Sequence, residues 1–450
     1  MRINKIAAVD VSSLSKRDVT FSLILIGTLF FIFGFVSWVN AILIPYFKIA
    51  CELTHFESYL VAFAFYIAYL VMSVPSSFLI KKVGFKKGIM LGFWIMSIGT
   101  FLFVPAAYMR TYGIFLTGLF IIGLGLSILQ TAANPYITIL GAPESAARRI
   151  SIMGVFNKGA GIIAPLLLAA IILRPSDSSV FMNLKVLPLS EKNILLDDLI
   201  RRVMLPYGVL TIILIVLGIV VHFAPLPEID TETEKGDLLE ANAAKKSIFD
   251  FPHLILGAVA IFLHVGTQVI AVDSIIGYAS SLGIGINKAK VFPSFTLTAT
   301  VCGYLMGILL IPKYISQLHA LKICTILGFV FSLLILFSNG NISLLGYETH
   351  VSIWFIVLLG LANSLVWAGI WPLALKGLGR FTKLGGSILI MGLCGNAILP
   401  LIYGKIADAY SVRIGYIVLL PCYSYLIYYA LKGHKISRWT KPKTLQWVKN

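Results

Sequence analysis

The sequence predicts an all-α polytopic membrane protein with twelve transmembrane helices in two six-helix bundles. Of its 450 residues, 58% are hydrophobic and only 12% are charged, whereas soluble domains carry about 25% charged residues. The apolar residues form segments of the roughly 20 residues that a helix needs to cross a bilayer core. Strands of a membrane barrel would be shorter and would alternate apolar with polar residues, so the pattern favours helices.

The predicted spans fall into two sets of six along the chain. The first set is centred near residues 33, 69, 97, 127, 161 and 214, and the second near residues 266, 301, 329, 364, 396 and 421. A polar stretch, "LPEIDTETEKGDLLEANAAKKSIF", separates the sets. We therefore expect an N-terminal six-helix bundle over 1–225, a cytoplasmic linker over 226–249, a C-terminal six-helix bundle over 250–432, and a basic cytoplasmic tail over 433–450.

The formal net charge of +17 is distributed unevenly along the chain. If the N-terminus is inside the cell, most lysines and arginines lie in the inner loops and in the two termini. This asymmetry is typical of membrane proteins, whose cytoplasmic loops are enriched in basic residues. It predicts that both termini are cytoplasmic, and it explains the basic charge without a nucleic-acid partner.

The two halves repeat short motifs in the same order. The fourth span carries "SILQTAANPYITILG" and the tenth carries "SLVWAGIWPLALKGLG"; the fifth carries "ISIMGVFNKGAG" and the eleventh carries "ILIMGLCGNAIL". Aligned on their methionines, the last two place Lys158 opposite Asn396. Parallel repeats of six helices indicate the major facilitator fold, in which substrate binds between the repeats near the bilayer midplane.

Lys158 is a cation in the middle of the fifth span. Counted from Arg148 and Arg149 at the inner end, it lies roughly 12–14 Å into the bilayer. A cation at that depth costs about 2.5–3.5 kcal/mol on insertion scales, so it should face a polar cavity or a partner. Two interpretations remain open: a role in substrate binding or coupling, and a structural hydrogen-bonding role.

Further polar and aromatic side chains are predicted at membrane depth in both halves. Amides offer donors and acceptors without charge, and aromatic faces suit the C–H face of a sugar ring, so we interpret these residues as candidates for a sugar site; packing between helices is the alternative for each. The candidate substrate-binding residues are Trp38, Asn40, Gln130, Asn134, Asn157, Lys158, Gln268, Asn363, Trp367 and Asn396.

Three titratable residues within spans are candidates for cation coupling. Asp273 is the only carboxylate well inside a span, and it lies in the outer third of the seventh. A carboxylate whose surroundings change can carry a proton through a transport cycle, although a position near the outer surface also suits a vestibule. His264 in the same span and Lys158 are the other candidates.

Motifs for catalysis or nucleotide hydrolysis are missing from the sequence. It contains no nucleophile motif, no His/Cys/acid cluster with metal-ligand spacing, and no phosphate loop ending in GK[ST]. The five cysteines show no pairing pattern. We therefore expect no enzyme activity, no cofactor and no metal site, and transport that is secondary rather than driven by ATP.

Long motifs resemble the fucose–galactose–glucose:H+ symporter family of major facilitators. They include "FFIFGFVSWVNAILIPYFK", "FAFYIAYLVMSVPSS" and "LQTAANPYITILG", while "ESAARRISIMGVFNK" and "GGSILIMGLCGNAILPLIYG" are most similar to its bacterial glucose and N-acetylglucosamine branch. In the fucose branch, acidic residues stand where this chain has Ala41 and Gln130. The resemblance therefore implies a sugar site that includes Gln130 and Lys158, but it does not carry over that acidic pair.

These observations together predict an importer of a monosaccharide of the glucose/galactose or N-acetylglucosamine type. It would work by alternating access as a monomer in a bacterial inner membrane, with H+ as coupling ion and Na+ as the other candidate. The alternatives are a uniporter of the same sugars, a major facilitator drug exporter, and a transport-dead sugar sensor.

Overall fold

The protein is described by a computed structural model, which covers residues 16–139, 146–177, 187–223, 247–311, 313–378 and 381–439. Within these ranges, twelve helical segments are long and apolar enough to cross a membrane. This confirms the fold class predicted from the sequence, a polytopic membrane protein. Most of the predicted linker and the end of the tail lie outside the described residues, so the domain boundaries stay a prediction.

The first half of the chain, here called the N half, has helices as its only regular secondary structure over its described residues. It contains α1 (Lys16–Trp38), α2 (Asn40–Ala50), α3 (His55–Ser58), α4 (Leu60–Val83), α5 (Phe85–Phe101), α6 (Phe103–Tyr108), α7 (Tyr112–Ile139), α8 (Ala146–Ile172), α10 (Leu189–Arg201) and α11 (Met204–Phe223). Helices α4 and α5 each pack along α7, while α1 packs along α8 and α11 along α5.

The second half, here called the C half, adds one small hairpin to its helices. Its α-helices are α12 (Pro252–Asp273), α13 (Ile275–Ser281), α14 (Ile286–Ala289), α15 (Phe292–Leu310), α16 (Gln317–Phe337), α17 (Val351–Asn363), α18 (Val366–Leu375), α19 (Thr382–Met391), α20 (Gly395–Ala409), α21 (Val412–Gly415) and α22 (Leu419–Leu431). The antiparallel strands β1 (Asn341–Leu344) and β2 (Tyr347–His350) join α16 to α17. Leu345 and Gly346, both with positive φ, form their two-residue turn.

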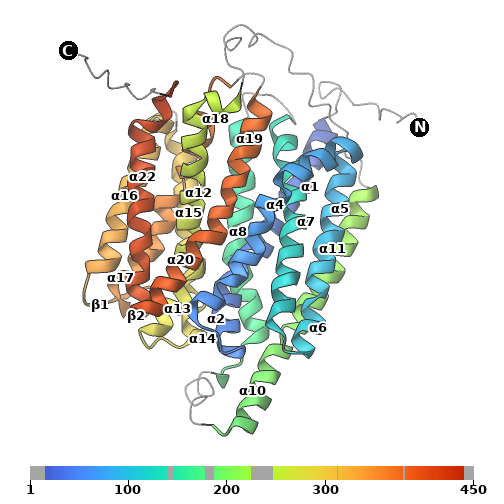
Figure 1. Ribbon diagram of the computed structural model, residues 1–450, viewed down its shortest axis with the longest axis vertical. Helices are drawn as coiled ribbons and strands as arrows, with labels where there is room; N and C mark the ends of the chain where they lie inside the picture. Colours follow the sequence, from blue (N-terminus) through green and yellow to red (C-terminus); the bar gives the residue numbers. More distant parts are fainter. Residues whose placement is uncertain are drawn as a thin grey trace, which may run out of the picture.

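The helices run roughly parallel to the long axis of the molecule (Figure 1). The described ends of the chain, at α1 and after α22, lie at one end of this axis; the opposite end, where α2, α3, α13 and α14 lie, is here called the distal end. Hydrophobic side chains fill the space between helices, while others face outward, as Phe78 does at 68% exposure. Exposed apolar residues of this kind suit a lipid environment.

The two halves meet along pairs of helices. Helix α8 packs against α15, α4 packs against α19 and α20, and the end of α12 reaches α2. Glycine allows one of these approaches: a Cβ added at Gly161 on α8 would lie 2.9 Å from Cδ1 of Leu297 on α15. This interface is the place where a major facilitator binds its substrate.

Candidate functional site

Lys158 on α8 is buried where the two halves meet. Its side chain is 8% exposed, and its Nζ donates a hydrogen bond to Oε1 of Gln268 on α12 at 3.1 Å. Nζ also lies 4.1 Å from the ring centroid of Trp38, which is within range of a cation–π interaction. The cation thus has a hydrogen-bond acceptor in the C half and an aromatic contact in the N half.

The Trp38 ring is held in place by its own half. Its Nε1 donates to Oδ1 of Asn157 at 3.5 Å, and Nδ2 of Asn157 donates to the backbone oxygen of Phe30 at 3.3 Å. The ring lies flat against Gly161, where an added Cβ would lie 2.4 Å from Cδ1 of Trp38. Four predicted residues, Trp38, Asn157, Lys158 and Gln268, thus form one connected group, here called the Lys158 group.

A second polar cluster lies within the C half. Oδ1 of Asn363 accepts hydrogen bonds from the Thr267 hydroxyl at 3.2 Å and from the Tyr423 hydroxyl at 3.0 Å. His264 lies beside Asn363 and within electrostatic range of Lys158, so this cluster borders the Lys158 group. The sequence reasoning missed Thr267 and Tyr423, because a hydroxyl in an apolar helix carries no distinctive sequence signal.

Asp273, Asn40 and Asn396 are buried without complete hydrogen bonding. Five polar atoms have no hydrogen-bonding partner among the described residues: both carboxylate oxygens of Asp273, both polar atoms of the Asn40 side chain and Oδ1 of Asn396. Asp273 is 1% exposed and Asn40 is fully buried. Two tyrosines of the N half, Tyr59 and Tyr66, are within electrostatic range of Asp273. The structure thus places this carboxylate in the interior, not in an open vestibule.

Gln130 and Trp367 have contacts of their own outside the Lys158 group. Nε2 of Gln130 donates to the Tyr69 hydroxyl at 2.9 Å within the N half. Trp367 stacks on Trp371 with ring centroids 5.1 Å apart. The Asn134 side chain lies outside the described residues. Within the described ranges, acidic, histidine and cysteine side chains form no group suited to a metal ion.

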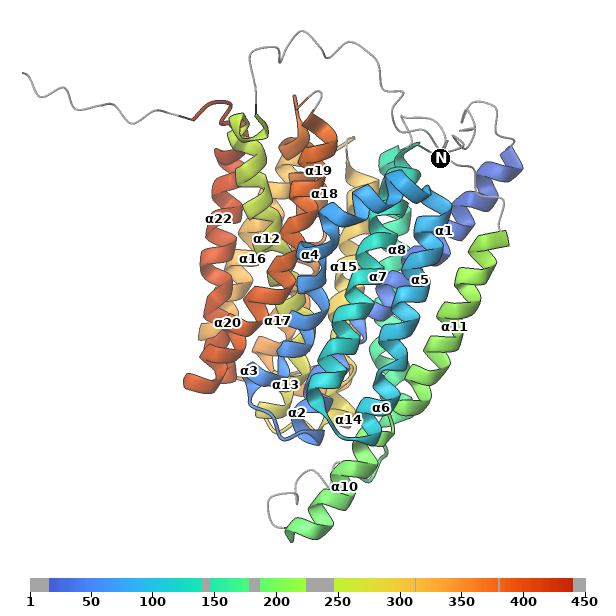
Figure 2. The same cartoon turned by 45° about the vertical axis from the view of Figure 1, so that its right-hand side comes forward.

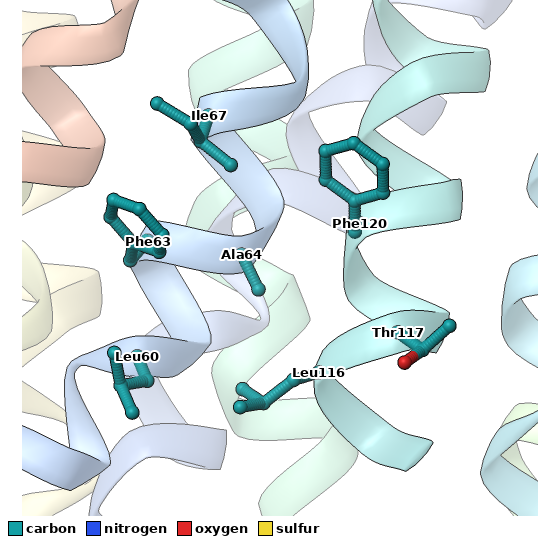
Figure 3. Close-up of a pocket in the computed structure, with 7 residues that line it drawn as sticks. All are labelled: Leu60, Phe63, Ala64, Ile67, Leu116, Thr117 and Phe120. Carbon is teal, nitrogen blue, oxygen red and sulfur yellow. The ribbon is translucent and has the colours of Figure 1, made fainter. Parts of the chain in front are cut away.

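A shallow groove between α4 and α7 is apolar (Figure 3). It is lined by Leu60, Phe63, Ala64, Ile67, Leu116, Thr117 and Phe120. Its one hydroxyl, on Thr117, already donates to the Gly113 backbone at 2.9 Å. The groove therefore offers a sugar a single acceptor and no free side-chain donor, and none of its lining residues belongs to the Lys158 group.

Twelve apolar helices in two halves, with buried polar groups where the halves meet, define a class of membrane transporters that bind substrate between two helical bundles. The chain belongs to the Major Facilitator Superfamily, whose family model matches residues 26–400. Both the fold expected from the repeats and the resemblance to this superfamily are thereby confirmed.

Named sugar transporters are similar to the chain over most of its length. A glucose/galactose transporter of Brucella abortus is 32% identical over 424 residues, covering 94% of this chain and 96% of that protein. The L-fucose-proton symporter of Escherichia coli is 28% identical over 407 residues, covering 89% and 90%. A crystal structure of a Major Facilitator Superfamily transporter, FucP, in the outward conformation superposes with a TM-score of 0.67 at 25% identity, covering 92% of this chain and 99% of that one.

Proposed function

We propose that the protein imports a monosaccharide by alternating access, coupled to H+. The observation that carries the proposal is the buried hydrogen bond between Lys158 and Gln268, which joins the two halves at the predicted substrate position. A ligand bound there would meet donors and acceptors from both halves, so its binding would be sensitive to how the halves are arranged. The similarity to glucose/galactose transporters supports a hexose as the substrate.

The Lys158 group has the chemistry that a sugar requires. An ammonium carries three donors, and each amide carries both donors and acceptors, which suits an array of hydroxyl groups. The Trp38 ring, fixed by Asn157 and Gly161, supplies a flat apolar surface for one face of the pyranose. Because Lys158 can also donate to an acetamido oxygen, N-acetylglucosamine belongs to the proposed substrates with glucose and galactose.

Asp273 is the proposed coupling residue. A buried carboxylate without a hydrogen-bonding partner is costly as an anion, so a change in its exposure would be linked to gain or loss of a proton. His264 and Lys158 are secondary candidates. We expect Asp273→Asn to retain sugar exchange across the membrane but to abolish accumulation driven by a pH gradient.

The proposed setting is the inner membrane of a bacterium, with the distal end facing outward and both termini in the cytoplasm. The lysines at the adjoining ends of α4 and α5 include Lys82 and Lys87. The junction of these two helices lies toward the end of the molecule that carries the termini, as the charge rule for cytoplasmic segments requires. Labelling of intact cells with an impermeant maleimide tests this topology. In a cysteine-free background, Leu345→Cys should react and Lys87→Cys should not.

The activity is proposed to be transport by a monomer rather than an enzymatic reaction. Its test is uptake of radiolabelled glucose, galactose and N-acetylglucosamine into proteoliposomes, with and without an imposed pH gradient, and with fucose as a competitor. Lys158→Ala and Gln268→Ala should each lower the affinity for sugar at least about tenfold, which corresponds to about 1.4 kcal/mol.

Two variants on α16 serve as matched controls. Lys322→Ala removes a lysine, and Ser332→Ala removes a buried hydroxyl that bonds only within its own helix; both should transport normally. Unchanged affinity in the two site variants would refute the proposed position of the sugar. Equilibration that ignores the pH gradient would instead favour a uniporter or another coupling ion.

A further inference from the structure

A short turn of the N half is seated in the C half at the distal end. The carboxylate of Asp408 on α20 accepts two backbone hydrogen bonds from the first residues of α3, from the His55 N–H at 2.9 Å and from the Phe56 N–H at 2.7 Å. Each carboxylate oxygen accepts from one N–H, so both oxygens and both N–H groups are hydrogen-bonded. It joins residues about 350 positions apart in the sequence, and so ties the two halves together.

The turn belongs structurally to the N half. A capping box closes it, because the Thr54 hydroxyl accepts from the Glu57 N–H at 3.1 Å while the Glu57 carboxylate accepts from the Thr54 N–H at 2.8 Å. The Tyr112 hydroxyl on α7 donates to the Glu57 backbone oxygen at 2.7 Å. These contacts do not involve the C half, so the turn would keep its shape if the halves separated.

Gly404 provides the recess that the turn occupies. A Cβ at this position would lie 2.7 Å from Cδ2 of Tyr59, and 3.1 Å from both the His55 backbone oxygen and the Phe56 Cα. Tyr59 is 3% exposed, and its ring packs edge-on against Tyr403, with centroids 5.5 Å apart. A tyrosine of the N half thus fills an aromatic pocket of the C half, and only glycine at position 404 admits it without displacement.

His55 makes the contact sensitive to charge. Its Nε2 lies 2.5 Å from Nζ of Lys48, a contact in which a neutral imidazole accepts from the ammonium. Burial and the Lys48 charge lower the pKa of His55, and the Asp408 carboxylate opposes them. Glu57 is the remaining charged group on the turn. A positive charge on the ring would be repelled by Lys48 within the N half and attracted by the Asp408 carboxylate across the contact.

We infer that the turn 54–59, together with Gly404 and Asp408, is the outer gate of the transporter, and that the structure has this gate closed. The inference rests on the proposed function for its orientation and deepens it, because it assigns positioning residues to the step that closes the outward path. Closing seats Tyr59 beside Gly404 and forms the two bonds to Asp408; opening breaks both while leaving the turn intact within the N half.

Substitution of Gly404 by alanine tests the gate without touching the Lys158 group. The added methyl group collides only in the closed arrangement, and overpacking of this kind typically costs about 1–3 kcal/mol, which equals about a 5- to 150-fold fall in the ratio of closed to open molecules. Gly277→Ala on α13 is the matched control, since a Cβ there meets nothing within 4 Å.

The readout is the distance between spin labels at the distal end, one on each half, measured by double electron–electron resonance. Met109 and Leu345 are suitable positions, at 54% and 66% exposure. In the absence of sugar, Gly404→Ala should shift the distribution toward longer distances, and Gly277→Ala should not. Uptake should fall in the first variant while sugar binding from the outer side persists.

A second variant covers the case in which Gly404→Ala fails to fold. Asp408→Asn keeps the shape of the side chain but removes its charge and one of its two acceptors, so it should shift the distances in the same direction by a smaller amount. Distance distributions identical to wild type in the folded variants would overturn the gate. Shifted distances in a protein that transports no sugar would uphold the gate and refute the proposed function.

Discussion

Gln268 accepts the hydrogen bond of the buried Lys158 ammonium. The interaction energy between these two side chains should therefore be measurable by substituting Gln268. In Gln268→Leu, the cation keeps the Trp38 ring at 4.1 Å but loses its bond of 3.1 Å. A hydrogen bond to a charged group contributes about 1.5–3 kcal/mol, and with Lys158 only 8% exposed water cannot readily replace the acceptor. We expect Gln268→Leu to lower the free energy of unfolding by that amount.

The pairwise term is isolated by a double-mutant cycle. Lys158→Met removes the cation and keeps a side chain of similar length, so in the double variant the leucine no longer faces an unpaired charge. The coupling between the two changes should be about 1.5–3 kcal/mol, measured by denaturant unfolding in mixed micelles. Lys322→Met, on α16, should show no coupling to Gln268→Leu. If the stability change of the double variant equals the sum of the two single changes to within about 0.5 kcal/mol, the two side chains do not interact and the proposed site is refuted.

Three further predictions test other parts of the structure. Gly34→Ala places a methyl group 1.9 Å from a backbone oxygen of α8, so it should lower the melting temperature in detergent, whereas Gly159→Ala, with open space around its Cβ, should not. Arg202→Gln removes the ion-pair partner of Asp177, whose side chain is 3% exposed, and should lower the free energy of unfolding by about 3–5 kcal/mol. Arg201→Gln, at an exposed position, should change the free energy of unfolding by about 0.5 kcal/mol or less. Because the folded protein lowers the pKa of His55 through burial and the Lys48 charge, it stabilises the neutral imidazole. That contribution to the free energy of unfolding should be complete above the ordinary histidine pKa of about 6.5 and should be lost as the pH falls below it. A His55→Gln variant whose free energy of unfolding keeps the full wild-type pH dependence would contradict that assignment.

The spans were predictable because hydropathy and length are properties of consecutive residues. The same holds for the depth of Lys158, which follows from counting residues along one helix. The break between α1 and α2 at Val39 was not predictable, because "SWVNAI" contains neither glycine nor proline. Trp38, just before the break, contacts Lys158, and Asn40, just after it, is fully buried.

Contacts between the halves depend on tertiary packing, which a single sequence does not reveal. Gln130 had the same sequence signal as Gln268, yet the first bonds within its own half and the second bonds across the interface. Asp408 lies in the last turn of α20, and its link to His55 and Phe56 appears only when the two halves are brought together.

Helices α10 and α11 continue one another over 35 residues, from Leu189 to Phe223, which is about 50 Å at 1.5 Å per residue. The bilayer core is only about 30 Å thick, and α10 extends beyond the rest of the molecule (Figure 2). Ion pairs from Asp197 to Arg110 and from Lys192 to Glu52 fix it to the N half. For electron cryo-microscopy of so small a membrane protein, α10 is therefore a usable handle: an antibody fragment raised against its protruding end would give the particles a feature to align on.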